Sequence, residues 1–463
     1  MAKPHWGHEQ SDLAPDPAVH WGVLPNGLRY AIRPNAEPKG RIAMRFVVLA
    51  GSMHEADDER GLAHFIEHMA FRSTRNYPNG TLTELLQRMG IAFGPDNTAF
   101  TNYDYTIYHL ELPNAREETI REGLGVFSEY ADGITFSKAE VDLERGVVLS
   151  ELSTRDKPNL RTYHANQKFM IPEARINERS PIGLEEQIRS FTPEQFQAFY
   201  DAWYRPERMI LTLVGEIEPL EGEKIITELF GSLEARGPSR PEPPLTIAGW
   251  TKTDHTQTRL FKESNITGIG LNLQHAIAKP PEPDTRVKWT RSLHGALAFH
   301  MLQRRFYNIS TRRGSSFISP SVNYGQGPKG WQVNTLTLHS SLRSWRMVIH
   351  DAEQELRRAL DFGFTEAELQ DAKTYYNTYY QQGVRSAATA PSSAIATNLV
   401  TAIAYDRVFA SAEIVEQEMK PIITGATLEN CWQAFREAWG EETPKLFVVA
   451  NSNFGHDEHD LAS

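Results

Sequence analysis

The sequence is short of cysteine, since Cys431 is the single thiol in 463 residues. One thiol cannot form an intramolecular disulfide, so cross-links do not hold this fold together. Long apolar runs are also missing, because no uninterrupted stretch approaches the roughly 18 residues that a membrane-spanning helix needs. We therefore expect no membrane span. The first eight residues lack the apolar segment of a secretory signal peptide.

An excess of basic charge is missing as well. The chain carries 48 Lys and Arg against 59 Asp and Glu, which gives a net charge of −11 and a pI near 5.8. Nucleic-acid binding needs clustered Lys and Arg, and here the basic residues are scattered, so we expect no nucleic-acid partner. The 40% hydrophobic and 23% charged residues are ordinary for globular proteins with large packed cores.

Chain length and one break in composition predict two domains. Residues 1–20 are polar and rich in Pro, Asp and His, which predicts an irregular N-terminal arm. The Pro-rich stretch 236–244 interrupts the periodicity, so we expect a linker over residues 236–249. Two domains follow from these boundaries, at residues 21–235 and 250–463.

The second half of the chain repeats the pattern of the first. The apolar run 42–49 predicts a strand covered on both faces, and a strand over 268–273 precedes a long helical run over 289–306. Further expected strands are 98–101, 105–112 and 208–214, and further expected helices are 81–89, 343–361, 365–383 and those beginning near Asn114, Ser137 and Thr192. We predict an α+β fold of two related domains, each with a mostly antiparallel sheet packed by helices. A generic α/β chain without duplication is the alternative.

The strongest chemical signal is a His-x-x-Glu-His pattern at His64, Glu67 and His68. Helical residues four apart share a face, so both imidazoles can reach one metal ion. Glu67 can then touch a water on that ion without being a ligand. Zn²⁺ held by neutral imidazoles lowers the pKa of its water to about 7, and a carboxylate takes the proton. The plainer interpretation is a pair of histidines on an amphipathic helix.

A third ligand should be a carboxylate on another rigid element, because catalytic zinc takes three protein ligands and keeps one position open. Glu144 and Glu151 are seven residues apart, two helical turns, so both project from one helix face. One can bind the metal while the other supports a ligand histidine or the water from outside the ligand set. Two solvated glutamates on an outer helix face are the alternative.

Taken together, these segments resemble the inverzincin metallopeptidases that include pitrilysin, insulin-degrading enzyme and the mitochondrial processing peptidases. The resemblance extends to bacterial zinc proteases of the PqqL type. It covers residues 20–235 in sequence and the rest in architecture only. The segments that carry it are 24–30, 60–71, 93–95, 106–113, 144–151, 199–206 and 214–216.

The resemblance implies a role for each site residue. His64 and His68 become ligands of one zinc ion, Glu67 the base, and Glu151 the third ligand. The family usually has about 75 residues between the second histidine and the ligand glutamate; Glu144 follows His68 after 75 residues and Glu151 after 82. The local context favours Glu151, and Glu144 is kept as a supporting catalytic residue. The strand that pairs with substrate corresponds to Thr98, Ala99, Phe100 and Thr101.

The resemblance also implies that this chain is half of a clam-shell chamber. In the family the opposite half offers an Arg and a Tyr, seven residues apart, that steady the substrate carbonyl. Arg305, Arg312, Arg313 and Tyr324 lack that spacing, and Phe317 stands near the expected Tyr. We therefore expect a second homologous subunit, in a heterodimer rather than a homodimer.

The expected function is a zinc-dependent endopeptidase that hydrolyses unfolded peptides inside this chamber. A non-catalytic structural subunit of a larger complex is the alternative, although it predicts damaged motifs. The expected compartment is the periplasm, reached by a signal peptide since removed, with the cytoplasm as the alternative.

Overall fold

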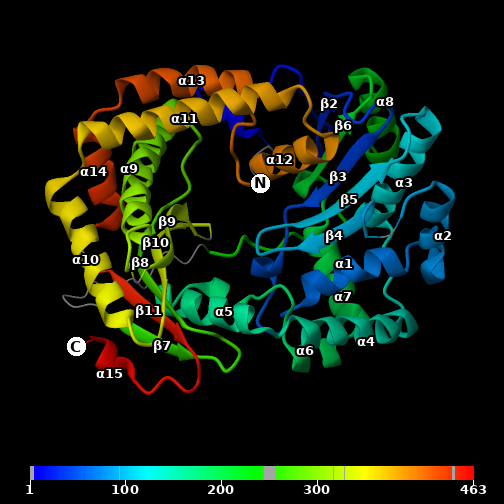
Figure 1. Cartoon of the computed structure of the whole chain (residues 1–463). Helices are drawn as coiled ribbons and strands as arrows, with labels where there is room; N and C mark the ends of the chain where they lie inside the picture. Colours follow the sequence, from blue (N-terminus) through cyan, green and yellow to red (C-terminus); the bar gives the residue numbers. More distant parts are fainter. Residues whose placement is uncertain are drawn as a thin grey trace. The chain divides into compact units, whose positions relative to one another are not determined.

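The protein forms two compact units in the computed structural model, which describes residues 5–92, 94–244, 257–315, 317–327, 329–440 and 444–462 (Figure 1). Unit 1 consists of the described residues of Met1–Arg155, Glu178–Pro244 and Ser386–Ser411. Unit 2 consists of those of Asp156–Asn177, Leu245–Arg385 and Ala412–Ser463. The chain therefore passes between the units several times.

Unit 1 is built on a six-stranded sheet in the order β1-β2-β6-β3-β5-β4. The strands are β1 (His20–Val23), β2 (Arg29–Pro34), β3 (Ile42–Val48), β4 (Asn97–Thr101), β5 (Thr106–Leu112) and β6 (Met209–Gly215). β2 and β6 run parallel, and the other neighbouring pairs are antiparallel. β4 ends the order, so its outer edge pairs with no other strand in the described part of the chain.

Apolar layers cover both faces of this sheet. Met44 and Phe46 of β3 belong to the large core that includes α1, α3, α7 and α8, whereas Ala43 and Val47 pack with α12 on the other face. This alternation explains why every residue of β3 is buried. The helices of the unit are α1 (Leu62–Arg72), α2 (Thr81–Arg88), α3 (Glu117–Asp132), α4 (Lys138–Arg155), α6 (Glu185–Ser190), α7 (Pro193–Trp203), α8 (Pro219–Phe230) and α12 (Ser392–Ala404).

Unit 2 has a five-stranded sheet in the order β7-β11-β8-β10-β9. β7 and β11 run parallel, and the other neighbouring pairs are antiparallel. Its strands are β7 (Thr258–Lys262), β8 (Ile269–Ala278), β9 (Ile318–Gln326), β10 (Trp331–Ser340) and β11 (Lys445–Ala450). Its helices are α5 (Pro158–Met170), α9 (Arg286–Ser310), α10 (Trp345–Phe362), α11 (Glu366–Ala387, in this unit up to Arg385), α13 (Ala412–Gly425), α14 (Leu428–Trp439) and α15 (Glu458–Ala462).

The two sheets share one topology. The order β2-β6-β3-β5-β4 in unit 1 becomes β7-β11-β8-β10-β9 in unit 2, with the same single parallel pair at the same place. In both units the helical insertion follows the middle strand of this order, as α1 and α2 after β3 and as α9 after β8. The predicted fold of two related domains, each with a sheet packed by helices, is confirmed, and the generic chain without duplication is wrong.

The individual elements agree closely with the sequence pattern. The run 42–49 forms β3, buried on both faces, and the helices expected at 289–306, 343–361 and 365–383 form α9, α10 and α11. Ser137 caps the start of α4, since its Oγ accepts a hydrogen bond from the Glu140 backbone N–H at 3.3 Å. Capping and periodicity signals involve only a few neighbouring residues, so they can be recognised in the sequence without knowledge of the tertiary structure.

The domain bounds expected from the sequence place one cut at residues 236–249, whereas the units exchange segments. α5 lies before that cut and belongs to unit 2, and α12 lies after it and belongs to unit 1. The apolar residues of α12 give the reason, because Ile395, Leu399 and Val400 pack on the unit 1 sheet. The expected arm residues 1–4, linker residues 245–249 and second-domain residues 250–256, as well as Phe93, lie outside the described residues.

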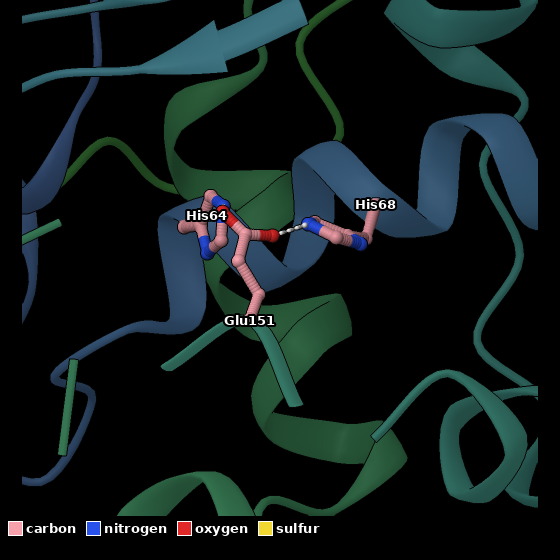
Figure 2. Close-up of side chains that lie close together, drawn as sticks. All are labelled: His64, His68 and Glu151. Carbon is pink, nitrogen blue, oxygen red and sulfur yellow. Dashed lines mark ion pairs between the residues drawn. The ribbon is translucent and has the colours of Figure 1, made fainter. Parts of the chain in front are cut away.

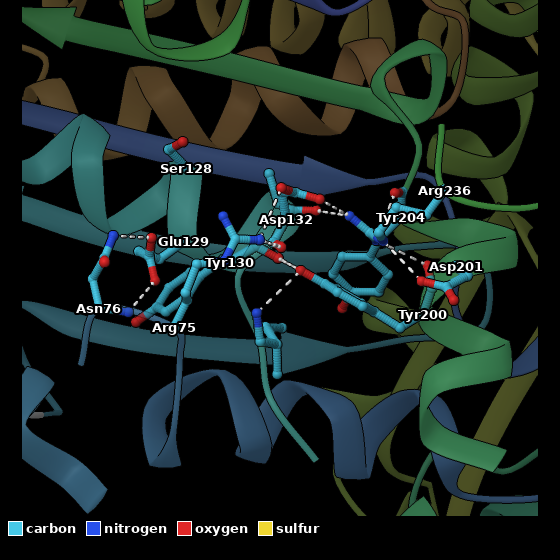
Figure 3. Close-up of polar contacts among 12 residues, drawn as sticks. Arg75, Asn76, Ser128, Glu129, Tyr130, Asp132, Tyr200, Asp201, Tyr204 and Arg236 are labelled. Carbon is cyan, nitrogen blue, oxygen red and sulfur yellow. Dashed lines mark hydrogen bonds and ion pairs between the residues drawn. The ribbon is translucent and has the colours of Figure 1, made fainter. Parts of the chain in front are cut away.

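The Pro-rich stretch after α8 is anchored to unit 1 at its first residue. Figure 3 shows Arg236 between Asp132 and Asp201, whose carboxylates lie 2.6 and 2.8 Å from its guanidinium nitrogens. The same guanidinium donates to the backbone oxygens of Tyr200 and Tyr204. Further along, Arg240 pairs with Glu59 at 2.6 Å. Ion pairs at Arg236 and Arg240 therefore anchor the first part of the Pro-rich stretch to unit 1.

Candidate active site

The helix that carries the motif, α1, is held firmly at its start. Gly61 precedes it with a φ of 101°, in the left-handed region that suits glycine. The fully buried carboxylate of Glu55 accepts hydrogen bonds from the backbone N–H groups of Gly61 and Ala63 at 3.1 and 2.9 Å. These bonds satisfy donors that a helix N-terminus leaves without partners. The rotation of the helix about its axis is fixed by the core packing of four buried residues, Leu62, Phe65, Ile66 and Met69.

His64 and His68 lie on one face of α1, as the four-residue spacing predicts (Figure 2). Their ring centroids are 4.7 Å apart and the ring planes are nearly perpendicular, at 77°. His64 is buried, with 3% of its surface exposed, and His68 is half-buried. Two imidazoles so placed can bind one ion together.

Glu151 comes from α4 and faces both histidines (Figure 2). Its Oε1 lies 3.6 Å from His64 Nε2 and its Oε2 lies 3.2 Å from His68 Nε2. One ligand atom from each of the three residues lies within 4.8 Å of the others. The structure thus gathers two imidazoles and a carboxylate at one point.

The donor set fits zinc. Zn²⁺ binds His nitrogen and carboxylate oxygen at about 2.0–2.2 Å, so neighbouring ligand atoms of a tetrahedral site are roughly 3.3–3.6 Å apart. The His–Glu distances of 3.2 and 3.6 Å are close to this spacing. Three protein ligands leave one position open, the arrangement of catalytic rather than structural zinc sites.

Glu144, one of the two candidate glutamates, contacts His68 from behind. Its Oε1 lies 2.9 Å from His68 Nδ1, on the opposite side of the ring from Glu151. A carboxylate in this position fixes the ring orientation and the tautomer of a ligand histidine.

Arg155 lies one turn after Glu151 on α4 and pairs with the Oε1 atom of Glu151 at 2.5 Å. Sequence reasoning missed Arg155, although its spacing of four residues from Glu151 was a usable signal.

Protonation at this site follows from burial and charge. Burial, with help from His68, lowers the pKa of His64 to about 3. Burial also acts to lower the pKa of His68, but the hydrogen bonds to Glu144 and Glu151 prevail and raise it to about 9. The hydrogen bond from His68 lowers the pKa of Glu151 to about 2. Without metal, a proton on His68 therefore stands where a cation would bind.

Glu67 faces the interior of the same site. It is 6% exposed, and burial raises its pKa to about 7 in spite of the nearby His68 and the hydrogen bond from Thr101. Thr101 of β4 donates that bond from Oγ1 to Glu67 Oε2 at 2.8 Å. A carboxylate whose pKa lies near neutrality can both accept and return a proton.

A cleft of about 660 Å³ in unit 1 opens onto these residues. Its wall includes every site residue expected from the sequence, together with Phe71, Arg72, Thr83, Val147 and Arg155, which were not foreseen. The strand residues Thr98, Ala99, Phe100 and Thr101 all line it. Their side chains alternate: Ala99 and Thr101 pair with Tyr108 and Thr106 on the α1 side, and Thr98 and Phe100 point to the other face.

Among the basic and aromatic residues considered in the second half, Arg312 and Arg313 are exposed, whereas Arg305, Phe317 and Tyr324 contact other side chains of unit 2. Arg305 of α9 lies between Glu355 and Glu368, with its Nη1 and Nε at 3.2 and 2.5 Å from their carboxylates. Phe317 is buried in the core of unit 2, and Tyr324 packs against Phe299.

Within the described ranges, no helix is both long and apolar enough to span a membrane.

Two sequence profiles of one peptidase family match this chain. Residues 30–172 match the profile described as Insulinase (Peptidase family M16), and residues 190–376 match that of the Peptidase M16 inactive domain. The probable zinc protease PqqL of Escherichia coli K12 is 29% identical over 435 residues, covering 92% of this chain and 46% of that protein. PqqL of Haemophilus influenzae is 36% identical over 218 residues, covering 47% of this chain and 24% of that protein.

Solved structures share the fold. The first half of the periplasmic protease PqqL from Escherichia coli superposes with a TM-score of 0.89 at 24% identity, covering 96% of this chain and 94% of that one. The chain spans about half the length, or less, of the curated relatives it matches. The paired profiles, the relatives and the shared fold lead to one conclusion: the chain belongs to the pitrilysin/insulinase family, peptidase family M16, and is similar to its PqqL-type zinc proteases.

Proposed function

We propose that this protein is a zinc-dependent endopeptidase in which His64, His68 and Glu151 hold one zinc ion. One observation carries the proposal: two imidazoles, a carboxylate and a buried glutamate meet in a single cleft. The geometry supports Glu151 over Glu144 as the third ligand, because Glu151 contacts the metal-facing nitrogens of both histidines, whereas Glu144 contacts only the far side of His68.

A bound zinc ion would supply an activated water and polarise the scissile carbonyl. The chain's own residues do the rest. Glu67 takes the proton of the attacking water and delivers it to the leaving amine, a role suited to a carboxylate that lines the same cleft as the proposed ligands. Glu144 keeps the His68 ring in place by its 2.9 Å contact with Nδ1. Phe71 and Val147 give the cleft an apolar part of its wall.

The substrate would be an unfolded peptide in extended conformation. β4 has an unpaired outer edge among the described strands, and four of its residues line the cleft. An extended chain can add to such an edge by main-chain hydrogen bonds, which tolerate many sequences. Thr98, Ala99, Phe100 and Thr101 would then contact the peptide beside the scissile bond.

The working enzyme would include a second homologous half that completes a chamber. The chain covers 46% of PqqL from Escherichia coli and 48% of its full crystal structure, which supports a two-half arrangement. That half would come from a longer chain or from another subunit, with a heterodimer preferred to a homodimer. Because the solved relative is called a periplasmic protease, we place the activity in the periplasm.

The test combines metal analysis with peptide digestion. Wild type, Glu67→Gln and the exposed control Glu118→Gln are compared with and without candidate second halves. Mass spectrometry measures zinc per chain, and a quenched fluorescent peptide reports cleavage. We expect one zinc ion in all three proteins and a loss of at least about 100-fold in kcat for Glu67→Gln alone. Wild type that holds zinc but cleaves no peptide in any pairing would favour the non-catalytic subunit.

A further inference from the structure

The carboxylate of Glu67 has one hydrogen-bond partner in the described part of the chain. Thr101 donates from Oγ1 to Glu67 Oε2 at 2.8 Å, across from α1 to the edge strand β4. Glu67 is 6% exposed and Thr101 9%, so water reaches this bond poorly. Oε1 of Glu67 makes no hydrogen bond to a described residue and remains available to a reactant.

A buried threonine of the neighbouring strand lies beside Thr101. Thr101 pairs with Thr106 of β5, and their hydroxyl oxygens are 3.4 Å apart. Thr106 donates its hydroxyl proton to the backbone oxygen of Ala50 at 2.9 Å. Because Thr106 is almost completely buried and is bonded to Ala50, the Thr101 side chain packs against a fixed neighbour.

A glutamate side chain has several rotatable bonds, and ordering it costs conformational entropy. The core packing of α1 fixes the backbone of Glu67 but not the orientation of its carboxylate group. The hydrogen bond from Thr101 fixes this orientation. It directs Oε2 towards β4 and leaves Oε1 for the reactant. Misplacement of a reacting group by about 1 Å can cost roughly 100-fold in rate.

We propose that Thr101 is a positioning residue that orients the base Glu67 through its hydroxyl group. This proposal rests on the peptidase function proposed above and assigns Thr101 a role beyond lining the substrate edge. According to the proposal, the main chain and one side chain of β4 have different functions. The main chain of β4 receives the peptide, and the Thr101 side chain serves the base.

The test compares Thr101→Val, which keeps the shape and removes the hydroxyl, with Thr101→Ser, which keeps the hydroxyl. In the active assembly we expect Thr101→Val to lower kcat about 10- to 100-fold, with KM within about twofold of wild type. Thr101→Ser should retain at least about half of kcat. The matched control is Thr119→Val, which removes a buried hydroxyl bonded to Asn114 on α3, outside the cleft.

Two further measurements separate a positioning role from an effect on zinc or peptide binding. Zinc per chain should equal that of wild type in Thr101→Val, and peptide affinity should be unchanged when Thr101→Val is added to inactive Glu67→Gln. The proposal is overturned if Thr101→Val keeps kcat, if Thr101→Ser is as impaired as Thr101→Val, or if the loss lies in KM or zinc.

A crystal structure of Thr101→Val separates this proposal from the function itself. The expected result is a Glu67 carboxylate turned away from β4 or spread over several orientations. A carboxylate that stays in place overturns the positioning role, whether or not wild type proves to be a peptidase. Wild type without zinc or cleavage in any pairing would instead refute the proposed function.

Discussion

Gly61 and Gly183 touch through their backbones at the start of the motif helix. A Cβ on Gly183 would lie 2.4 Å from the Gly61 Cα, and a Cβ on Gly61 would lie 2.8 Å from the Gly183 Cα. Both residues have positive φ, at 101° and 80°. The segment before α6 thus fits against the segment before α1 only because neither residue carries a side chain.

Gly183→Ala should therefore be strongly destabilising. Left-handed backbone costs an alanine about 1–2 kcal/mol, and a forced backbone contact adds roughly 1–3 kcal/mol. We expect the free energy of unfolding in urea to fall by about 2–5 kcal/mol. Gly40→Ala is the control, because Gly40 also has a positive φ, of 75°, with nothing within 4 Å. Equal losses for the two variants would show that the contact contributes nothing.

The two glutamates of α4 should differ in their effect on zinc. Glu151→Gln removes a proposed ligand, whereas Glu144→Gln weakens only the support of His68, a kind of change that typically costs about 10- to 100-fold in metal affinity or activity. We expect Glu151→Gln to lose zinc during dialysis and Glu144→Gln to retain it with about 10- to 100-fold weaker binding. Competition with a chromogenic chelator measures both affinities. The reverse order would make Glu144 the third ligand.

The contribution of His109 to the stability of the metal-free protein should fall on mild acidification. Burial, helped by the charge of Arg45, lowers the pKa of His109 on β5 to about 3, against about 6.5 in an unfolded chain. Between these values the unfolded state binds more protons, so stability is present above pH 6.5 and is lost as pH falls. From pH 7 to pH 5 this histidine should remove about 1–2 kcal/mol.

Urea titrations at several pH values measure this effect. His109→Gln should flatten the acid slope, while His350→Gln, at an exposed position on α10, should leave it unchanged. His64 adds a similar contribution in the metal-free state, since burial lowers its pKa to about 3 as well. A His109→Gln slope identical to that of wild type would contradict the prediction.

Zinc removal should loosen unit 1 selectively. A ligand that binds only the folded state stabilises it by about 4 kcal/mol at 1,000 times its Kd. Because the proposed ligands join α1 to α4, we expect faster backbone hydrogen exchange in these two helices after chelation. The sheet of unit 2, including β8 and β10, should exchange as before. Uniform changes in both units, or none, would speak against a zinc site between α1 and α4.

Local sequence signals predict much of the fold and several of the side chains that meet at the candidate site. The four-residue spacing of His64 and His68 fixes their common helix face, and the apolar run 42–49 fixes β3 as a buried strand. The seven-residue spacing of Glu144 and Glu151 placed both on one side of α4. Which of the two faces the Nε2 atoms depends on how α4 packs on α1, and periodicity does not contain that information.

Contacts between segments that are distant in the chain could not be predicted from the sequence. The bond from Thr101 to Glu67 joins residues 34 positions apart, and the Glu55 carboxylate caps α1 from six and eight positions away. α12 was assigned to the second domain because it follows the Pro-rich stretch, yet its apolar residues match the uncovered face of the first sheet. An amphipathic helix shows in its sequence that it needs a partner, but not which one.

The place of α12 in the chain sets an order for folding during synthesis. The strands of the unit 1 sheet are complete once residue 215 has been made, but the helix that covers Ala43, Val47 and Val214 ends at Ala404. Four of the five strands of unit 2 are made in between. A nascent chain therefore carries an open apolar sheet face while most of its second unit is being translated, and we expect α12 to complete the folding of unit 1.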